Sequence, residues 1–239
     1  MKIGVISDIH NNIIALDRVL DYFEENNCKY IICCGDIIGI GPHPEETVRR
    51  LMLLSNLICV RGNHEDYLSC TMDNMPFPAK MKPGEAMYHR WEHSMLSEES
   101  KSFLYQLPRE RSITISGTHI YAVHYSIGSS NTYNTPEKNL TLCQCEHMFS
   151  NIDADVVLFG HSHKNSVHQN EKTLYINIGS LGCPSKSKNM ARAGMLNLTE
   201  GKAVFENVEL AYDVSAVINE IDRLNYPANN EVKQIFYGL

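Results

Sequence analysis

Three short apolar runs, each ended by polar residues and separated from the next by a helix-like stretch, constrain the fold most. The runs cover residues 2–7, 30–34 and 57–60, and they end at Asp8, Asp36 and Asn63. Asp36 follows Asp8 by 28 residues and Asn63 follows Asp36 by 27, close to the ~30 residues of a strand–helix–strand unit. Because right-handed crossovers make such strands parallel, we expect the three polar ends to converge at one edge of a sheet, where α/β proteins bind ligands.

The connections between these runs have the pattern of helices. In the first connection, apolar side chains recur near every 3.6 residues, at Ile14, Leu16, Val19, Leu20 and Phe23. The second connection, residues 44–54, begins with a proline and two glutamates, which favour the first turn of a helix. The sequence therefore predicts alternating strands and helices around a parallel sheet.

The rest of the chain predicts further helices and a series of hairpins. We expect helices at residues 84–93, 97–107 and 213–224, and another that follows a polar loop (126–136) and ends near 149. We expect paired strands at 111–115 with 119–124, 165–169 with 173–177 and 193–198 with 203–210, and a buried strand at 156–159. The tail around Pro227 is expected to pack loosely. No internal repeat or linker interrupts the pattern, so we predict one domain over residues 1–239, an α/β sandwich of two sheets with flanking helices.

The composition excludes several classes of protein. Acidic side chains number 28 against 21 lysines and arginines, so the net charge is −7 and a nucleic-acid polymer is a poor fit as partner. No apolar run approaches the ~18 residues of a membrane span, and the stretch before Asp8 is too short for a secretion signal. The eight cysteines include no C-x-x-C pair, so we expect free thiols. These features predict a cytoplasmic protein without a membrane partner.

Five polar clusters interrupt the apolar segments, each at the end of an expected strand. As metal ligands they supply two carboxylates, one amide oxygen and four imidazoles, from Asp8, Asp36, Asn63, His10, His124, His161 and His163. Seven such ligands exceed the needs of one divalent ion but suit two ions that share a bridging carboxylate. Nitrogen and oxygen ligands without thiolate favour Mn, Fe, Zn or Co over Ca.

Two metal ions ~3.5–4 Å apart form a recognised arrangement for in-line displacement at phosphorus. Such a reaction also needs a donor that protonates the leaving oxygen. His64 lies one residue beyond Asn63, and imidazole titrates in the right range for this role.

At these clusters the chain resembles the calcineurin-like metallophosphoesterase superfamily. The signature of that superfamily runs D-x-H, G-D, G-N-H-[DE], a lone His and G-H-x-H, and this chain has all five blocks in that order between residues 8 and 163. The resemblance implies a compact two-sheet α/β sandwich. It also implies that the first metal is held by Asp8, His10, Asp36 and His163, and that Asp36 bridges to a second metal held by Asn63, His124 and His161.

The same resemblance implies that His64 is the general acid, that His64 and Asn63 contact the phosphate, and that Mn or Fe are the favoured metals. Departures from the signature narrow the substrate class. The serine/threonine protein phosphatases of the superfamily continue G-D with Asp-Arg-Gly, whereas residues 37–42 here contain neither the phosphate-binding Arg nor the Asp that orients the catalytic His. The chain is more similar to the small prokaryotic phosphodiesterase branch, and residues 177–180 resemble the N-P-G-S loop of that branch, with Ile178 in place of Pro.

These observations predict an enzyme that hydrolyses a small phosphodiester, nucleotide or phosphomonoester by in-line attack of metal-bound hydroxide. The alternatives are a protein serine/threonine or dinucleoside-polyphosphate phosphatase and, from a different class, a non-catalytic scaffold such as the one in the retromer trafficking coat. The complete ligand set argues against a purely structural role. A homo-oligomer formed through an apolar strand edge stays open.

Several other residues allow two interpretations each. His89 and His93 lie four apart on an expected helix and either form a metal pair or, as we favour, lie on a solvated face. His43 either contacts substrate or begins a helix, and residues 72–95 either pack in the core or form one wall of the cleft. Cys143, Cys145 and His147 alternate on an expected helix, where their side chains do not converge, so we reject a zinc site there. For Lys186, Lys188 and Arg192 a solvated hairpin loop is favoured over binding of a second phosphate.

Overall fold

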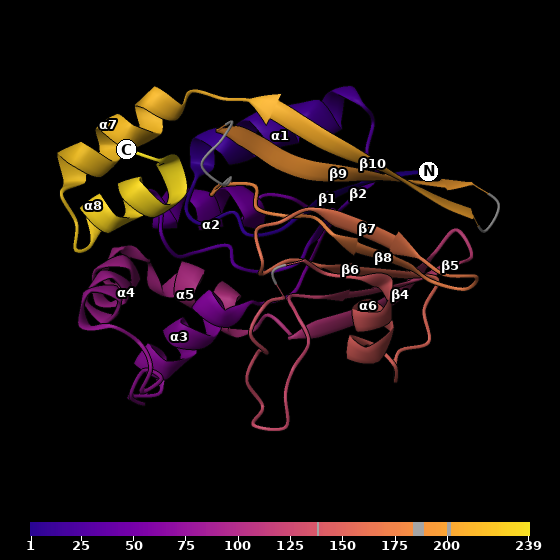
Figure 1. Ribbon diagram of the computed structural model, residues 1–239. Coiled ribbons are helices and arrows are strands. Elements are labelled where there is room, and N and C mark those ends of the chain that lie inside the picture. The colour runs from indigo at the N-terminus through magenta and orange to yellow at the C-terminus, as the bar shows by residue number, and fades with distance from the viewer. Residues whose placement is uncertain (138, 184–188, 200–201) are drawn as a thin grey trace.

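Two mixed five-stranded sheets lie face to face, with helices on their outer faces and at one end, in the computed structural model (Figure 1). The structure describes residues 1–137, 139–183, 189–199 and 202–239. This arrangement is the predicted two-sheet α/β sandwich with flanking helices.

The first sheet contains the three parallel strands predicted at the start of the chain. Its order is β10-β9-β1-β2-β3, with β1 (Lys2–Ile6), β2 (Tyr30–Cys33), β3 (Leu57–Cys59), β9 (Met190–Thr199) and β10 (Lys202–Ala211). Strand β1 pairs in parallel with β2, and β2 pairs in parallel with β3. Strand β9 is antiparallel to both β1 and β10, so the predicted hairpin joins the sheet and is longer than expected.

The second sheet brings another set of parallel carboxyl ends to the same region. Its order is β4-β5-β6-β8-β7, with β4 (Glu110–Ile115), β5 (Thr118–Val123), β6 (Val156–Phe159), β7 (Ser166–Gln169) and β8 (Leu174–Asn177). Strands β5, β6 and β8 are parallel, whereas β4 and β7 form the two predicted antiparallel hairpins.

The core between the sheets follows from the two-residue period of the strands. Ile3 and Val5 of β1 face the second sheet, where they join a cluster that includes Val156 and Leu158 of β6. Gly4 faces the opposite way, and a Cβ there would lie 2.4 Å from the ring of Phe23, so glycine allows the first helix to pack against the strand. Because both faces of these strands are covered, they are continuously apolar.

Helices cover the outer faces. The apolar cluster outside the first sheet includes residues of α1 (Ile13–Glu25), α2 (Pro44–Met52) and α5 (Glu98–Tyr105), and α6 (Leu142–Met148) covers the second sheet. The remaining helical elements gather at the left end of the sandwich in Figure 1: α3 (Asn63–Met72), α4 (Pro83–Met95), α7 (Val214–Leu224), α8 (Asn229–Val232) and a π-helical turn, Lys233–Tyr237. No helix in the described ranges has the length and apolar character needed to cross a bilayer.

At this end of the molecule one helix was not predicted and one expectation is wrong. The sequence did not predict α3, because residues 62–64 were interpreted only as the polar end of a strand, whereas Gly62 is the N-cap of the helix. The C-terminal tail does not pack loosely: Tyr226, Val232 and Tyr237 are buried in a cluster with Tyr88 of α4. Aromatic residues spaced along the tail supply the apolar surface that anchors it.

Candidate metal centre

The polar residues that end the parallel strands of both sheets meet at one place. Asp8, Asp36 and Asn63 follow β1, β2 and β3, His124 follows β5, and His161 and His163 follow β6. His10, two residues after Asp8, completes the set. The structure thus brings together all seven side chains predicted as ligands, in two adjoining groups.

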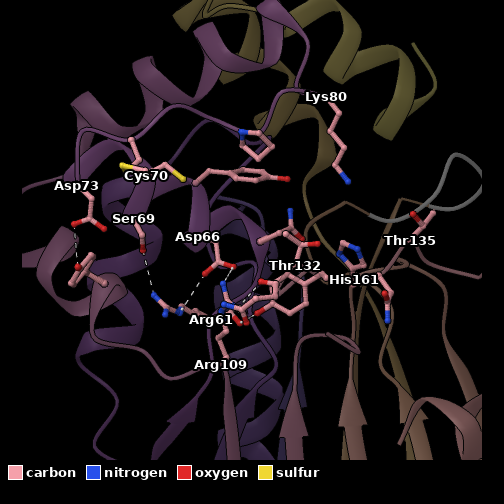
Figure 2. A pocket seen from close by; sticks show the side chains of 18 of the residues that line it. Arg61, Asp66, Ser69, Cys70, Asp73, Lys80, Arg109, Thr132, Thr135 and His161 are labelled. Carbon is pink, nitrogen blue, oxygen red and sulfur yellow. Dashed lines mark hydrogen bonds and ion pairs between the residues drawn. The ribbon is translucent and has the colours of Figure 1, made fainter. Parts of the chain in front are cut away.

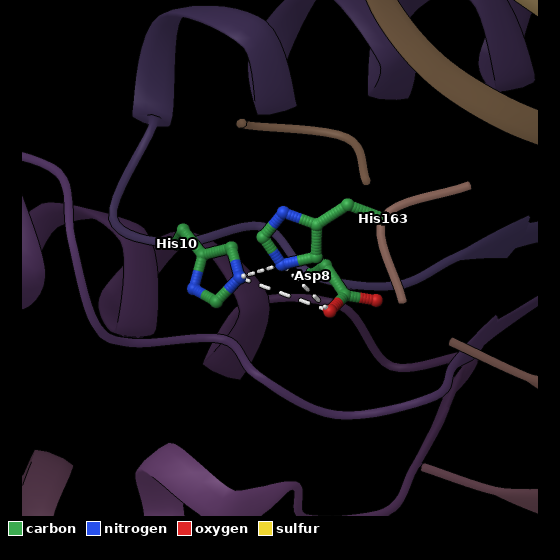
Figure 3. A group of neighbouring side chains, drawn as sticks. All are labelled: Asp8, His10 and His163. Atoms are coloured by element: carbon green, nitrogen blue, oxygen red, sulfur yellow. Dashed lines mark hydrogen bonds and ion pairs between the residues drawn. The ribbon is translucent and has the colours of Figure 1, made fainter. Parts of the chain in front are cut away.

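The first group contains Asp8, His10 and His163 (Figure 3). The Nε2 atoms of His10 and His163 are 2.9 Å apart, and Asp8 Oδ1 lies 3.7 Å from the first and 3.3 Å from the second. Asp8 Oδ1 is buried and has no hydrogen-bond partner among the described residues. The two Nε2 atoms and Asp8 Oδ1 thus face one another at a buried point, and Asp8 Oδ1 has no partner there. A bound cation would fit this arrangement.

The second group surrounds His124 Nε2. This atom lies 3.2 Å from Asp36 Oδ2, 3.2 Å from Asn63 Oδ1 and 3.1 Å from His161 Nδ1. Asp36 Oδ2 is also 4.0 Å from His10 Nε2 in the first group. One carboxylate oxygen therefore stands between the two groups, where a bridging ligand would be required.

Backbone carbonyls orient two of the imidazoles. His10 Nδ1 donates to the carbonyl of Ile38 at 3.1 Å, and His124 Nδ1 donates to that of Cys34 at 2.8 Å. A neutral ring that donates through Nδ1 keeps its lone pair on Nε2, the atom that faces the other candidate ligands. Such hydrogen bonds on the far nitrogen are typical of metal-binding histidines.

The backbone around the candidate ligands is strained. Five of them, Asp8, His10, Asp36, His161 and His163, have φ angles between 51° and 70°. Left-handed conformations are uncommon for residues other than glycine and concentrate at functional sites.

Asp8 is held by both sheets. Its Oδ2 atom accepts from Ser7 Oγ at 2.6 Å and from the backbone N–H of His161 at 3.0 Å. Ser180 Oγ, in the loop of residues 177–180, donates to the Asp8 carbonyl at 2.8 Å. A Cβ at Gly160 would lie 1.9 Å from Ser7 Oγ, so only glycine allows the two sheets to approach here.

Burial and mutual charge set the protonation of the centre. Burial raises the pKa of Asp8, but its hydrogen bond and charge interaction with His163 outweigh that effect and lower the pKa to about 2. Burial lowers the pKa of His10 and of His161 to about 4. These residues are thus a carboxylate and two neutral imidazoles at pH 7, the forms that bind metals.

His124 behaves differently. Burial lowers its pKa, but the charge of Asp36 and the hydrogen bond between them raise it to about 10. A metal ion at this point would take the place of the proton that lies between His124 and Asp36. We therefore expect metal binding to release a proton from the second group.

His64 lies at the first turn of α3, beside both groups. Its backbone N–H donates to Asp36 Oδ1 at 3.0 Å, and its Nε2 is 3.9 Å from Asp36 Oδ2. Burial lowers the pKa of His64 to about 3. Its Nδ1 atom has no hydrogen-bond partner in the described part of the chain, so no carboxylate orients the ring directly, as the sequence departure implied.

Glu65 was not assigned a role from the sequence, yet it holds the loops of the centre together. Its buried carboxylate accepts the backbone N–H groups of Gly62, Asp36, Ile37 and Ile38 at 2.7 to 3.1 Å. Glu65 is also the third residue of α3, and its bond from the N–H of the N-cap residue Gly62 is the half of a capping box that glycine allows. Glutamate three residues after an N-cap is the signal that could have indicated this role.

Replacing Glu65 by alanine should destabilise the protein by about 3 kcal/mol or more, because the loss of a buried acceptor costs roughly 1–3 kcal/mol for each donor left unpaired. Denaturant unfolding would measure the change, with Glu171→Ala in an exposed turn as the control. Equal unfolding midpoints for the two variants would contradict this role.

A cavity of about 670 Å³ opens beside the second group and is bordered by Asn63 and His161 (Figure 2). Asp66 lies between two arginines on its floor, 3.4 Å from Arg61 Nε and 2.8 Å from Arg109 Nη2. Figure 2 shows Lys80 extending from the rim toward the interior. Residues 72–95 thus supply part of the wall, as one of the two interpretations of that segment suggested.

The remaining candidates are placed as follows. His89 and His93 are not on a solvated face: α4 turns them inward, where they are 0% and 2% exposed, so that expectation is wrong. His43 is the N-cap residue of α2.

Among the basic residues considered for a second phosphate, Arg192 lies in β9 and pairs with Glu209 at 3.1 Å, while Lys186 and Lys188 lie outside the described residues. All eight cysteines are free thiols, as predicted, and Cys143, Cys145 and His147 lie on α6.

The chain matches a known protein family and is similar to proteins of other organisms over most of its length. The family model of the calcineurin-like phosphoesterase superfamily domain matches residues 1–201. The chain is 28% identical to the uncharacterized protein MJ0912 of Methanocaldococcus jannaschii, over 94% of this chain and 93% of that protein. It is 24% identical to phosphodiesterase YfcE of Escherichia coli K12, over 82% of this chain and 88% of that protein.

A crystal structure of a metallophosphoesterase from Sphaerobacter thermophilus has the same fold. It superposes with a TM-score of 0.77 at 22% identity, covering 100% of this chain and 99% of that one. The two-sheet sandwich is therefore confirmed by a solved structure as well as by the topology of this chain.

Proposed function

Because this chain belongs to the calcineurin-like phosphoesterase superfamily, we propose that it hydrolyses small phosphoesters at a dinuclear centre held by Asp8, His10, Asp36, Asn63, His124, His161 and His163. The observation that carries the proposal is the position of Asp36 Oδ2, 3.2 Å from His124 Nε2 and 4.0 Å from His10 Nε2. A single buried carboxylate oxygen between two clusters of lone pairs matches the ligand arrangement of a two-metal site. Mn or Fe are the proposed metals.

The bound metals would activate the attacking water and neutralise charge on the phosphoryl oxygens. The protein's own part is to position the phosphate and to move a proton. Asn63 and His64, at the N-terminus of α3, lie where the positive end of the helix dipole attracts an anion. Anionic phosphate beside His64 favours the imidazolium and so opposes the effect of burial, after which His64 can protonate the leaving alkoxide.

The cavity favours a substrate with organic groups around the phosphate. Its volume of about 670 Å³ far exceeds that of a phosphate ion and falls in the range of small-molecule sites, roughly 300–1,000 Å³. Tyr67 and Tyr133 line it together with Met75 and Pro78, so it offers apolar as well as polar contacts. We therefore propose a small phosphodiester as the preferred substrate class, ahead of nucleotides and phosphomonoesters.

The test is hydrolysis of a bis-aryl phosphate beside a mono-aryl phosphate by the protein reconstituted with Mn, with Asp36→Ala as the inactive control. We expect diester turnover to exceed monoester turnover, because the cavity accommodates a second ester group. Monoester preference would contradict the diester assignment and direct the search to nucleotides, dinucleoside polyphosphates and phosphoproteins. No hydrolysis of either substrate by protein holding two metals would overturn the enzymatic role in favour of a binding scaffold.

A further inference from the structure

Helix α4 presents a second cluster of potential ligands, which none of the roles above uses. His89, Glu92 and His93 stand at positions i, i+3 and i+4, so their side chains share one face of the helix. That face is turned inward, and the three residues are 0%, 0% and 2% exposed. One ligand atom from each lies within 4.8 Å of the other two.

The hydrogen bonds of His93 leave a lone pair directed at a carboxylate. Thr71 Oγ1 donates to the carbonyl of Tyr67 at 3.4 Å and lies 2.8 Å from His93 Nδ1. In the tautomer in which His93 Nδ1 donates to Thr71 Oγ1, the lone pair of the ring is on Nε2. That Nε2 atom is buried without a hydrogen-bond partner among the described residues and lies 3.8 Å from Glu92 Oε2. A lone pair facing a carboxylate oxygen is repulsive unless a cation lies between them.

Glu92 is a buried carboxylate without a full counter-charge. Its Oε1 atom accepts from the N–H of Gly39 and from Asn11 Nδ2, while Oε2 accepts from His89 Nδ1 at 3.1 Å. Among the described residues, its ion-pair partners are His89 and His93, with no lysine or arginine. Buried charges in proteins are paired or bind metals, and the possible counter-charges beside Glu92 are imidazole rings.

We propose that His89 Nδ1, Glu92 Oε2 and His93 Nε2 hold a third metal ion, Zn²⁺, separate from the dinuclear centre. Tetrahedral zinc with ligands at 2.0–2.2 Å places neighbouring ligand atoms roughly 3.4 Å apart, and the separations here are 3.1 Å for His89 to Glu92 and 3.8 Å for Glu92 to His93. The ion displaces the proton of His89 from Nδ1, and a water molecule fills the fourth position. Two imidazoles and a carboxylate form a ligand set typical of zinc.

The ion has a route to this site from the surface. A cavity of about 380 Å³ is lined by Thr71 of α3, by His93 and Arg90 of α4 and by residues of α5. Of the two cationic side chains that line this cavity, Arg90 and Lys101, the second pairs with Glu98 at 2.7 Å. The cluster thus has three ligand side chains, hydrogen bonds that orient them and a cavity through which an ion can enter.

A metal ion bound at this site would restrict the motion of the backbone that packs against the His64 ring. Glu92 binds the N–H of Gly39, and a Cβ on Gly39 would lie 2.2 Å from His64 Nδ1, so this backbone is packed directly against the His64 ring. The His89 and His64 rings are 5.1 Å apart. The third ion is therefore a structural metal that positions the surroundings of His64 rather than a participant in the reaction.

The test measures zinc bound after dialysis, in protein whose dinuclear centre has been disabled by Asp8→Asn and Asp36→Asn. Asparagine keeps the hydrogen-bonding shape of both residues. We expect this double variant to retain one equivalent of Zn²⁺ and to lose it on adding His93→Gln. The matched control adds His147→Gln, an exposed histidine of α6, and should keep the ion. Circular dichroism establishes that each variant is folded.

Two results would overturn the proposal: a folded double variant that binds no zinc, or one whose zinc survives His93→Gln. Neither result bears on the dinuclear centre, which is tested by the metal content of the wild type relative to the double variant. A tetrahedral spectrum of Co²⁺ substituted into the double variant, lost with His93→Gln, would support the ligand assignment independently.

Discussion

Replacing Asp36 by alanine should remove the second metal and lower phosphoester turnover by about 10³-fold or more, equivalent to about 4 kcal/mol of transition-state stabilisation. Asp36 Oδ2 is the atom that lies between the two groups of candidate ligands, close to both His124 and His10. Without Asp36, the metal site formed by Asn63, His124 and His161 has no negatively charged ligand, and the first site keeps only one of its two carboxylates. Metal analysis after dialysis and hydrolysis of a bis-aryl phosphate measure the two losses separately.

Asp36 also has a structural contact, which the controls must separate from metal binding. Its Oδ1 atom accepts the N–H of His64 and so caps the start of α3. Asp36→Asn keeps an oxygen for this bond and removes the charge, so it should retain the fold while losing metal. Asp153→Ala, at an exposed ion pair with Lys172, should change neither metal content nor turnover. Two tightly bound metals and ordinary turnover in Asp36→Ala would refute the bridging role.

Replacing His64 by alanine should leave both metals bound but lower turnover by about 10²–10⁴-fold on alkyl esters, the usual contribution of a general acid. The His64 ring lies near His10 and Asp36, but its hydrogen bond to Asp36 is made by the backbone N–H, which alanine keeps. The loss should shrink to roughly tenfold or less with nitrophenyl esters, because a good leaving group departs without protonation. The measurement is kcat for paired alkyl and nitrophenyl substrates at fixed metal content.

A uniform loss on both leaving groups would contradict proton donation and indicate that His64 acts by binding phosphate. Loss of a metal would instead make His64 a ligand, beside Asp36 Oδ2, which is 3.9 Å from its Nε2. The His64→Gln variant provides the second control, because it restores a hydrogen-bond donor of similar length without an acidic proton.

The seven residues of the candidate centre could be selected from the sequence because their signal is local. Asp8, Asp36 and Asn63 each end an apolar run, and the spacing between the runs matches a strand–helix–strand unit. His161 and His163 likewise follow the apolar run of β6. Polar residues at the carboxyl ends of parallel strands converge in any fold of this kind.

The helix that carries Asn63 and His64 was harder to predict. Its first residues also end β3, so one stretch of sequence terminates a strand and starts a helix. The sequence places Glu65 three residues after Gly62, but glycine by itself is a weak signal for the start of a helix.

The inward orientation of His89, Glu92 and His93 was missed because polarity is a poor guide to burial on α4. The same helix exposes Met87 and Met95, at 56% and 47%, while it buries three polar side chains. A sequence pattern shows which residues share a helix face, but not whether that face meets solvent. That depends on what packs against it, here Thr71 of α3 and the backbone of Gly39.

The sequence by itself determined the parallel direction of the first three strands, the ends of these strands and the identity of the polar residues there, because strand period, turn residues and crossover length are local properties. Tertiary structure alone decided which of those residues become neighbours. His10 and His163 are 153 residues apart in the chain, yet their Nε2 atoms are 2.9 Å apart. Their meeting, the burial of the tail and the inward face of α4 depend on how two sheets and the helices at one end pack together, because burial is a property of surfaces brought together by the whole fold.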